Sequence, residues 1–228
     1  MKTLFVVAIG LLLLPLQACA TEYSADPITA YVVDAETGKP IEGVVVVAHW
    51  QLYGGLHPDR AGELTIMETT TDKSGRFHFP AWGPKPLPEE VSSNARLTYL
   101  DPEIMLFKGG YEYTRLTNEL TMAALRGEKP PKRQSDWDLK TIRVKRFAKE
   151  DIQQRHKSAG FVSNDVGAIS RSDCNWRAIP RVIRELTAED EFFKESGIEH
   201  PGIYSIHYLP TNESKCGSVK HFFSGAPR

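Results

Sequence analysis

Residues 28–80 constrain the fold of this chain more than any other segment. They begin with a run rich in β-branched residues at 28–33, and four consecutive valines follow within the apolar segment 43–50. β-Branched and aromatic residues favour strands, and a short apolar run without alternation is typical of a strand buried on both faces. Residues 76–79 alternate polar and aromatic side chains, as in a strand with one face in a core. The segment therefore predicts β-structure.

Turn residues punctuate these runs. Gly38 and Pro40 mark a turn after the first strand, because glycine tolerates positive φ and proline presets its own φ. The sequence Asp-Lys-Ser-Gly at 72–75 predicts a β-hairpin turn that joins a strand at 63–71 to the next one at 76–79. Residues 21–27 are expected to form a polar tether, and the proline-rich residues 82–90 are expected to lack regular structure.

Further short strands are predicted downstream. They lie at residues 96–99, 104–108, 111–116 and 139–147. The last segment alternates strictly and places charged side chains on one face, which is typical of an edge strand. About seven strands at this spacing predict a mainly β fold, an immunoglobulin-like sandwich over residues 28–147.

The periodicity changes after residue 148. Residues 149–157 favour a helix, and Trp176, Ile179, Ile183 and Leu186 recur at helical spacing. The sequence at 187–190 resembles a capping box and predicts the start of a separate short helix, which Gly197 would end. Residues 203–208 alternate again and suggest one more strand. Residues 148–228 are therefore predicted to form a mainly helical segment packed on the sandwich.

The turn and strand pattern of residues 34–77 resembles that of carboxypeptidase regulatory-like domains. The resemblance is carried by Asp34, Thr37, Gly38, Lys39, Pro40, Ile41, Gly43, Val44, Thr70, Thr71, Asp72, Gly75 and Phe77, and it extends more loosely to Pro102 and to residues 108–111. These domains are small β-sandwiches of the prealbumin or transthyretin type, found beside metallocarboxypeptidases and in many exported bacterial proteins. The resemblance implies a non-catalytic domain, because the zinc-binding catalytic domain of those enzymes has no counterpart here.

The N-terminus has the pattern of an export signal over residues 1–20. Lys2 precedes an unbroken apolar run at 4–14, which is too short to span a membrane and typical of a secretory signal. Two processing interpretations remain open. The sequence Leu-Gln-Ala-Cys at 16–19 resembles a bacterial lipobox, in which Cys19 carries lipid and anchors the protein to a membrane facing the periplasm or cell surface. Alternatively, cleavage after Ala20 releases a soluble periplasmic or secreted protein.

Export affects the expected state of the remaining cysteines. With Cys19 processed, two cysteines remain, Cys174 and Cys216. In an oxidising compartment a disulfide between them is the expected outcome. Closing a loop of about forty residues contributes roughly 4 kcal/mol in the chain-entropy model.

No catalytic constellation is visible in the sequence. A Gly-x-Ser-x-Gly motif is absent, and His49, His57 and His78 lack the spacing of a zinc site. An enzyme would require one of these histidines to converge with carboxylates in a cleft. The net charge of −1 gives no indication of nucleic acid binding. The sequence therefore predicts neither an enzyme, nor a metal, nor a cofactor.

Candidate ligand-binding residues lie in the loops of the predicted sandwich. His57 occupies a loop with glycine and proline, and loops on rigid scaffolds often carry function. Tyr53 and Trp82 belong to a group of aromatic residues that would suit a sugar-binding platform or fill the core; the others are Trp50, Tyr99, Tyr111 and Tyr113. Basic residues outnumber acidic ones by eleven to five in residues 126–157, which fits either a solvated strand edge or a surface near anionic lipid headgroups.

These observations predict a non-catalytic binding or scaffolding module at the bacterial cell envelope. It would engage another envelope protein through a sheet edge or the C-terminal helices. The alternative is a carbohydrate-binding sandwich that uses loop aromatics such as Tyr53 and Trp82.

Overall fold

The computed structural model describes residues 22–54, 59–92, 94–98, 100–119, 133–170, 174–198, 201–210 and 212–225. The predictions for the export signal, for lipidation at Cys19 and for ligand binding at His57 lie outside the described residues, as does Tyr99.

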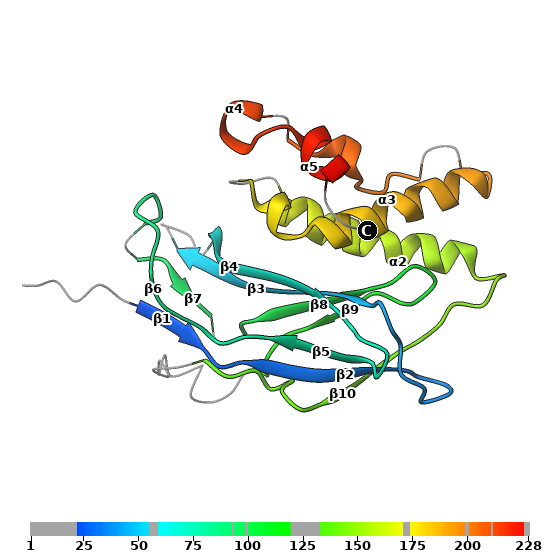
Figure 1. Ribbon diagram of the computed structural model, residues 1–228, viewed down its shortest axis with the longest axis horizontal. Helices are drawn as coiled ribbons and strands as arrows, with labels where there is room; N and C mark the ends of the chain where they lie inside the picture. The colour runs from blue at the N-terminus through cyan, green and yellow to red at the C-terminus, as the bar shows by residue number, and fades with distance from the viewer. Residues whose placement is uncertain are drawn as a thin grey trace, which may run out of the picture.

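The described part of the chain is mainly β, with a layer of helices on one side (Figure 1). Its strands are β1 (Glu22–Ala25), β2 (Ile28–Asp34), β3 (Val45–Gly54), β4 (Asp59–Thr70), β5 (Arg76–Phe79), β6 (Trp82–Pro86), β7 (Arg96–Leu97), β8 (Glu103–Phe107), β9 (Thr114–Leu116) and β10 (Thr141–Val144). The helices are α2 (Ile152–Ser170), α3 (Pro180–Glu195), α4 (Glu213–Cys216) and α5 (Val219–Gly225), with 3-10 turns η1 (Asn175–Ala178) and η2 (Ile206–Tyr208).

Two sheets form the sandwich. The larger has the order β4-β3-β8-β9, with β7 also paired to β3, and the smaller has the order β10-β2-β5. Between them lies an apolar core that includes Val46, Trp50, Phe77 and Phe79. β10 is the edge strand that the alternation predicts. Ile142 and Val144 are buried, and Arg143 between them is exposed. The predicted fold class, a β-sandwich followed by helices, is confirmed.

β3 is buried on both faces along residues 45–52, as its run of valines predicts. Val46, Ala48, Trp50 and Leu52 face the sandwich core, because alternate side chains of a strand point to opposite faces. Val45 and Val47 point the other way and pack under the helices. The large sheet is therefore the middle layer of the molecule, with the small sheet on one side and the helices on the other (Figure 1).

The turn at residues 72–75 is not a hairpin turn. Asp72 does close a tight turn, since its carboxylate accepts hydrogen bonds from the backbone N–H groups of Ser74 at 2.8 Å and Arg76 at 3.0 Å. However, β4 belongs to the large sheet and β5 pairs with β2 in the small one. The turn therefore carries the chain across the sandwich, which local turn chemistry cannot distinguish from a hairpin.

Two further strands occur where none was expected. β1 lies in the supposed tether and pairs antiparallel with β6, which lies in the proline-rich segment. Both are edge strands of a two-stranded sheet, where proline is tolerated because one side of each strand needs no ladder hydrogen bonds. Tyr23 and Ala25 of β1 are buried in the sandwich core, so burial of these two side chains stabilises a pairing that composition alone does not favour.

The helices also differ in detail from the prediction. Residues 187–190 do not start a new helix, because Thr187 lies inside α3 and its hydroxyl donates to the Ile183 carbonyl at 2.8 Å. Gly197 follows the end of α3 with φ of +89°, as predicted. Residues 206–208 form a 3-10 turn rather than a strand. Within the residues described, no helix is long and apolar enough to cross a membrane.

Candidate binding groove in the helical layer

A disulfide shapes the outer part of the helical layer. Cys174 precedes η1 and is bonded to Cys216 at the end of α4, as the pairing of the two cysteines predicts. Arg177 reinforces this junction, because its guanidinium donates to the Cys216 carbonyl at 2.6 Å. At the start of α4, Asn212 provides the N-cap, and its side chain accepts from the backbone N–H of Lys215. α4 is thereby fixed above the longer helices (Figure 1).

α5 is held by aromatic packing. Trp176 is fully buried, and its ring meets that of Phe222 edge-on at 5.2 Å and that of Phe223 in a stacked arrangement at 6.0 Å. The backbone of α5 is tied to α3, because Arg184 donates to the Phe223 carbonyl at 2.7 Å. These contacts place one face of α5 opposite η2 and the segment that follows it.

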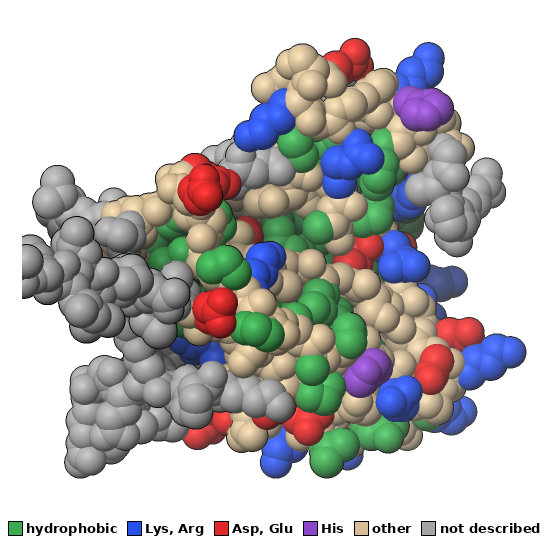
Figure 2. All heavy atoms as spheres, turned by 60° about the vertical axis from the view of Figure 1, so that its left-hand side comes forward, with side chains coloured by type: hydrophobic (Ala, Val, Ile, Leu, Met, Phe, Trp, Pro, Cys, Tyr) green, Lys and Arg blue, Asp and Glu red, His purple; other side chains and the backbone are tan. Residues whose placement is uncertain are grey.

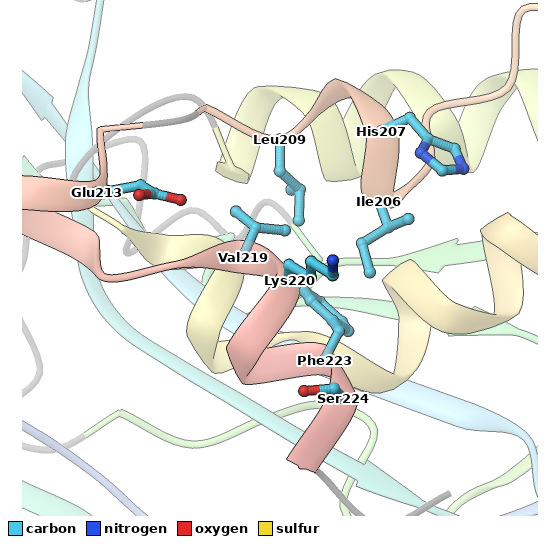
Figure 3. A pocket seen from close by; sticks show the side chains of 8 residues that line it. All are labelled: Ile206, His207, Leu209, Glu213, Val219, Lys220, Phe223 and Ser224. Atoms are coloured by element: carbon cyan, nitrogen blue, oxygen red, sulfur yellow. The ribbon is translucent and has the colours of Figure 1, made fainter.

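A groove of about 590 Å³ lies between these two segments (Figure 3). Its walls are mainly apolar, and Figure 3 shows Ile206, Leu209 and Val219 directed toward one shared space, with Phe223 below them. The polar residues of its lining are His207, Glu213, Lys220 and Ser224, and the imidazole of His207 points away from the apolar side chains. We call this set of eight residues the apolar groove.

A second hollow of about 920 Å³ adjoins the apolar groove. The linings of the two hollows share Ile206 and Phe223, so the hollows lie side by side. The rest of this adjacent hollow is lined by the start of β3, the end of β4 and α3. Its other residues are Gly43, Val45, Thr70, Arg181, Arg184, Glu185, Thr187, Ala188 and Glu191. Green side chains are visible beneath the uppermost lobe of the molecule, where α4 and α5 lie (Figure 2). The surface thus combines an apolar floor with charges of both signs.

The candidate residues Tyr53 and Trp82 do not come together. Trp82 is partly buried on the sandwich side, where its ring packs edge-on against Trp50 at a centroid distance of 5.2 Å. Tyr53 lies on the opposite face of β3, and its hydroxyl donates to the side-chain carbonyl of Gln51 at 2.6 Å. Because alternate residues of β3 face opposite sides, these two rings do not build one platform.

His49 does converge with carboxylates, as an enzyme would require, but in a buried position. Its Nδ1 lies 3.0 Å from Glu63 Oε2, its Nε2 lies 3.3 Å from Glu103 Oε1, and Gln51 contacts the same ring. His49 is 1% exposed and the Glu63 side chain 3%, so a substrate has no access to this pair. We call His49, Gln51, Tyr53, Glu63 and Glu103 the polar cluster.

The electrostatics of the polar cluster follow from this burial. Desolvation disfavours a charged imidazole, but the hydrogen bonds to Glu103 and Glu63 outweigh it and raise the pKa of His49 to about 9. The same contact lowers the pKa of Glu103, against the effect of its burial. His49 is thus a cation between two carboxylates at neutral pH, which is the arrangement of a buried structural ion pair. Among the described residues, no group of histidine, cysteine, aspartate or glutamate side chains could hold a metal ion.

Sequence reasoning identified His49 but missed its partners. Glu103 lies directly opposite His49 in the β3–β8 register, and Glu63 lies opposite Gln51 on β4. A β-bulge in β4 beside Glu63 places Glu63 opposite Gln51, and no sequence motif predicts this bulge. The apolar groove was also missed, although Val219 and Phe223 follow a helical i, i+4 spacing that signals one apolar face.

Comparisons with known proteins place the chain in no family. No protein-family model matches it, and no curated protein matches its sequence. Among solved structures it is similar to 3-chlorocatechol 1,2-dioxygenase from Rhodococcus opacus 1CP, with 16% identity, a TM-score of 0.33, and coverage of 58% of this chain and 64% of that one. It is also similar to the shaft pilin SpaA from Lactobacillus rhamnosus GG, with 14% identity, a TM-score of 0.27, and coverage of 56% and 52%.

The chain spans less than two thirds of the length of either protein. The assignment of a β-sandwich rests on the strand pairing of this chain itself.

Proposed function

We propose that this protein is a non-catalytic binding module of the bacterial cell envelope, which engages another protein through the apolar groove. The observation that carries the proposal is the pair of adjoining hollows that share Ile206 and Phe223. A concave surface with apolar walls suits the buried anchor side chains that dominate protein interfaces, and the surrounding charges suit a polar rim. The export signal predicted at residues 1–20 supports the envelope location, with Cys19 as the predicted lipid anchor.

The structure supports a rigid platform for such a partner. The disulfide and the Arg177 and Arg184 hydrogen bonds hold the walls of the groove before any partner arrives. A preformed site reduces the ordering cost of binding, because its side chains lose little freedom on association. The groove also lies on the C-terminal helices, one of the two surfaces that the sequence favours for a partner.

The test is site-specific crosslinking in cells. A photoreactive amino acid is placed at Lys220, an exposed residue of the apolar groove, and in a separate strain at Lys73, an exposed residue of the turn between β4 and β5. We expect one envelope protein to be captured from position 220 and not from position 73. The captured protein is then purified, and its affinity is measured for the wild type and for Lys220→Glu and Lys73→Glu.

Lys220→Glu should weaken the complex at least tenfold, while Lys73→Glu leaves it unchanged. The proposal is wrong if both positions capture the same protein equally, or if the wild type, Lys220→Glu and Lys73→Glu bind it with equal affinity. If position 220 captures no protein while the purified chain binds an oligosaccharide, the carbohydrate alternative replaces it.

A further inference from the structure

A third hollow is lined in part by the segment where the chain leaves β10 and enters α2. This segment lies at one end of the molecule (Figure 1). The hollow encloses about 640 Å³, within the range of small-molecule sites. Three segments build it: residues 108–111 between β8 and β9, residues 146–155 leading into α2, and Phe192 with Ser196 at the end of α3. It does not overlap the apolar groove, and the polar cluster contributes no residue to its lining. We call this hollow the basic pocket.

Every charged side chain that lines the basic pocket is a cation. These residues are Lys108, Arg146, Lys149 and Arg155, and neither aspartate nor glutamate occurs in the lining among the residues described. Arg155 is neutralised by Glu189, which it contacts through Nε at 3.0 Å and through a second nitrogen. Within the described chain, Arg146 and Lys149 have no carboxylate at ion-pair distance. Positive charges gathered in a concave site reinforce one another and attract an anion.

Carboxylates near the pocket are engaged by other groups. Asp34 interacts electrostatically with Arg146, but its carboxylate accepts hydrogen bonds from the backbone N–H and the hydroxyl of Thr37. Glu185 accepts a hydrogen bond from the Gly109 backbone N–H at 2.8 Å, and Glu189 is bound by Arg155. Glu150 and Asp151 follow Lys149 directly in the chain but do not line the hollow. The positive charge of Arg146 and Lys149 is therefore available to a ligand.

Aromatic and apolar side chains form the other walls. Arg155 lies over the ring of Phe192 at 3.7 Å from its centroid, and Arg146 lies over the ring of Tyr111 at 5.8 Å. Phe147 and Ile152 complete the apolar part of the lining. The backbone behind these side chains is fixed, because Phe147 donates to the Gly110 carbonyl at 2.9 Å and Tyr111 pairs with Arg146 in an isolated bridge. The side chains of Arg146 and Arg155 therefore lie beside aromatic rings, on a backbone fixed by hydrogen bonds.

We propose that the basic pocket binds a small organic anion, one that carries a phosphate or carboxylate group beside an aromatic or apolar portion. Arg146 and Lys149 would hold the anionic group, since Arg in particular pairs with phosphate and carboxylate oxygens. The rings of Tyr111, Phe147 and Phe192 would cover the apolar portion. This site is independent of the partner-binding function proposed for the apolar groove.

The experiment uses phenyl phosphate as the probe, with inorganic phosphate and phenol as its two halves, and isothermal titration calorimetry on the oxidised protein. The test variant is Arg146→Gln with Lys149→Gln. The matched control is Arg143→Gln with Lys145→Gln, which removes the same charge from exposed residues of the same segment that do not line the pocket. All four side chains are exposed, so both variants should keep the wild-type circular dichroism spectrum.

Phenyl phosphate should bind the wild type and the control variant with similar affinity and bind the test variant at least tenfold more weakly. Each half probe should bind the wild type more weakly than phenyl phosphate does. The proposal is overturned if phenyl phosphate fails to bind the wild type at millimolar concentration or if both variants lose affinity equally. It is also overturned if inorganic phosphate binds as tightly as phenyl phosphate, because the aromatic walls would then contribute nothing.

Discussion

The two faces of β3 differ in how they join the layers of the molecule. Toward the small sheet, Val46, Trp50 and Leu52 present an apolar surface that packs without directional bonds. Toward the helices, the same strand changes from apolar Val45 and Val47 to the polar cluster around His49. The sandwich core is therefore held by close packing, whereas the helical layer depends on particular hydrogen bonds as well as apolar contact.

Directed bonds from the sheet fix the helical layer at several points. Glu68 of β4 accepts hydrogen bonds from the backbone N–H groups of Arg181 at 2.9 Å and Val182 at 2.8 Å, in the first turn of α3. Ser158 of α2 accepts from the Tyr113 backbone N–H at 2.8 Å. Each bond satisfies a group that would otherwise be left unpaired between layers, so single polar substitutions should affect this interface strongly.

The largest expected effect comes from the disulfide, which belongs to the helical layer alone. Replacing both cysteines, Cys174→Ser with Cys216→Ser, should lower the free energy of unfolding by about 4 kcal/mol, because the unfolded chain regains the freedom of a closed loop. Urea denaturation measures the loss. Hydrogen exchange should show reduced protection in α4 and α5 while β2 and β3 keep theirs. A loss of protection spread evenly over β3 and α5 would contradict the separation of the two layers.

A smaller effect is expected at Glu68, which connects the layers. Glu68→Ala leaves the Arg181 and Val182 N–H groups without their acceptor and should cost about 1–3 kcal/mol of stability. The two N–H groups bond to different oxygens of Glu68, so Glu68→Gln keeps an acceptor for one of them and should cost less than Glu68→Ala. Burial raises the pKa of Glu68 to about 7, against the effect of the two N–H bonds, so a neutral replacement is tolerated near that pH.

The control for Glu68 is Glu42→Ala, which removes an exposed carboxylate from the sandwich. It should change the free energy of unfolding by less than about 0.5 kcal/mol. Urea denaturation at pH 7 compares the three variants with the wild type. If Glu68→Ala proved as mild as Glu42→Ala, the directed bonds would contribute nothing measurable to the attachment of α3.

The sandwich could be predicted from the sequence because its signals are local. Each of these elements is predicted by its own residues: β3 by its valines, β10 by its alternation, and the turn after β2 by its turn residues. The resemblance over residues 34–77 then indicates that several of these elements belong to one fold. The crossover at 72–75 was misread because a tight turn has the same residues whether its strands share a sheet or not. β1 and β6 were missed because their stability comes from burial of Tyr23 and Ala25 rather than from strand propensity.

The candidate sites were harder to predict, since each depends on tertiary packing that no local residue spacing specifies. The apolar groove lies between η2 and α5, in the layer that the Cys174–Cys216 disulfide cross-links. Glu68 meets α3 across more than one hundred residues of chain, and no spacing rule connects the two. The disulfide itself was predictable because two cysteines remain outside the predicted export signal, and pairing them in the expected oxidising compartment requires no geometry.

The polar cluster gives the most selective test of the difference between the two faces of β3. Its His49 has a folded-state pKa of about 9, above the ordinary value of 6.5. A raised pKa contributes stability that is fully present below about pH 6.5 and is lost as the pH rises through 9. The free energy of unfolding should therefore fall over this interval, and in His49→Gln the fall should be smaller by roughly 1–3 kcal/mol.

Urea denaturation at pH 6, 7.5 and 9 measures this slope, which separates the titration of His49 from any loss of packing in the variant. His78→Gln is the matched control, because His78 is an exposed histidine of the small sheet that contacts only the Thr29 hydroxyl among its side-chain hydrogen bonds in the described structure. It should leave the slope unchanged. Equal slopes in the wild type and His49→Gln would mean that His49 is neutral in the folded protein, and the helix-facing side of β3 would then hold its layer without a buried cation.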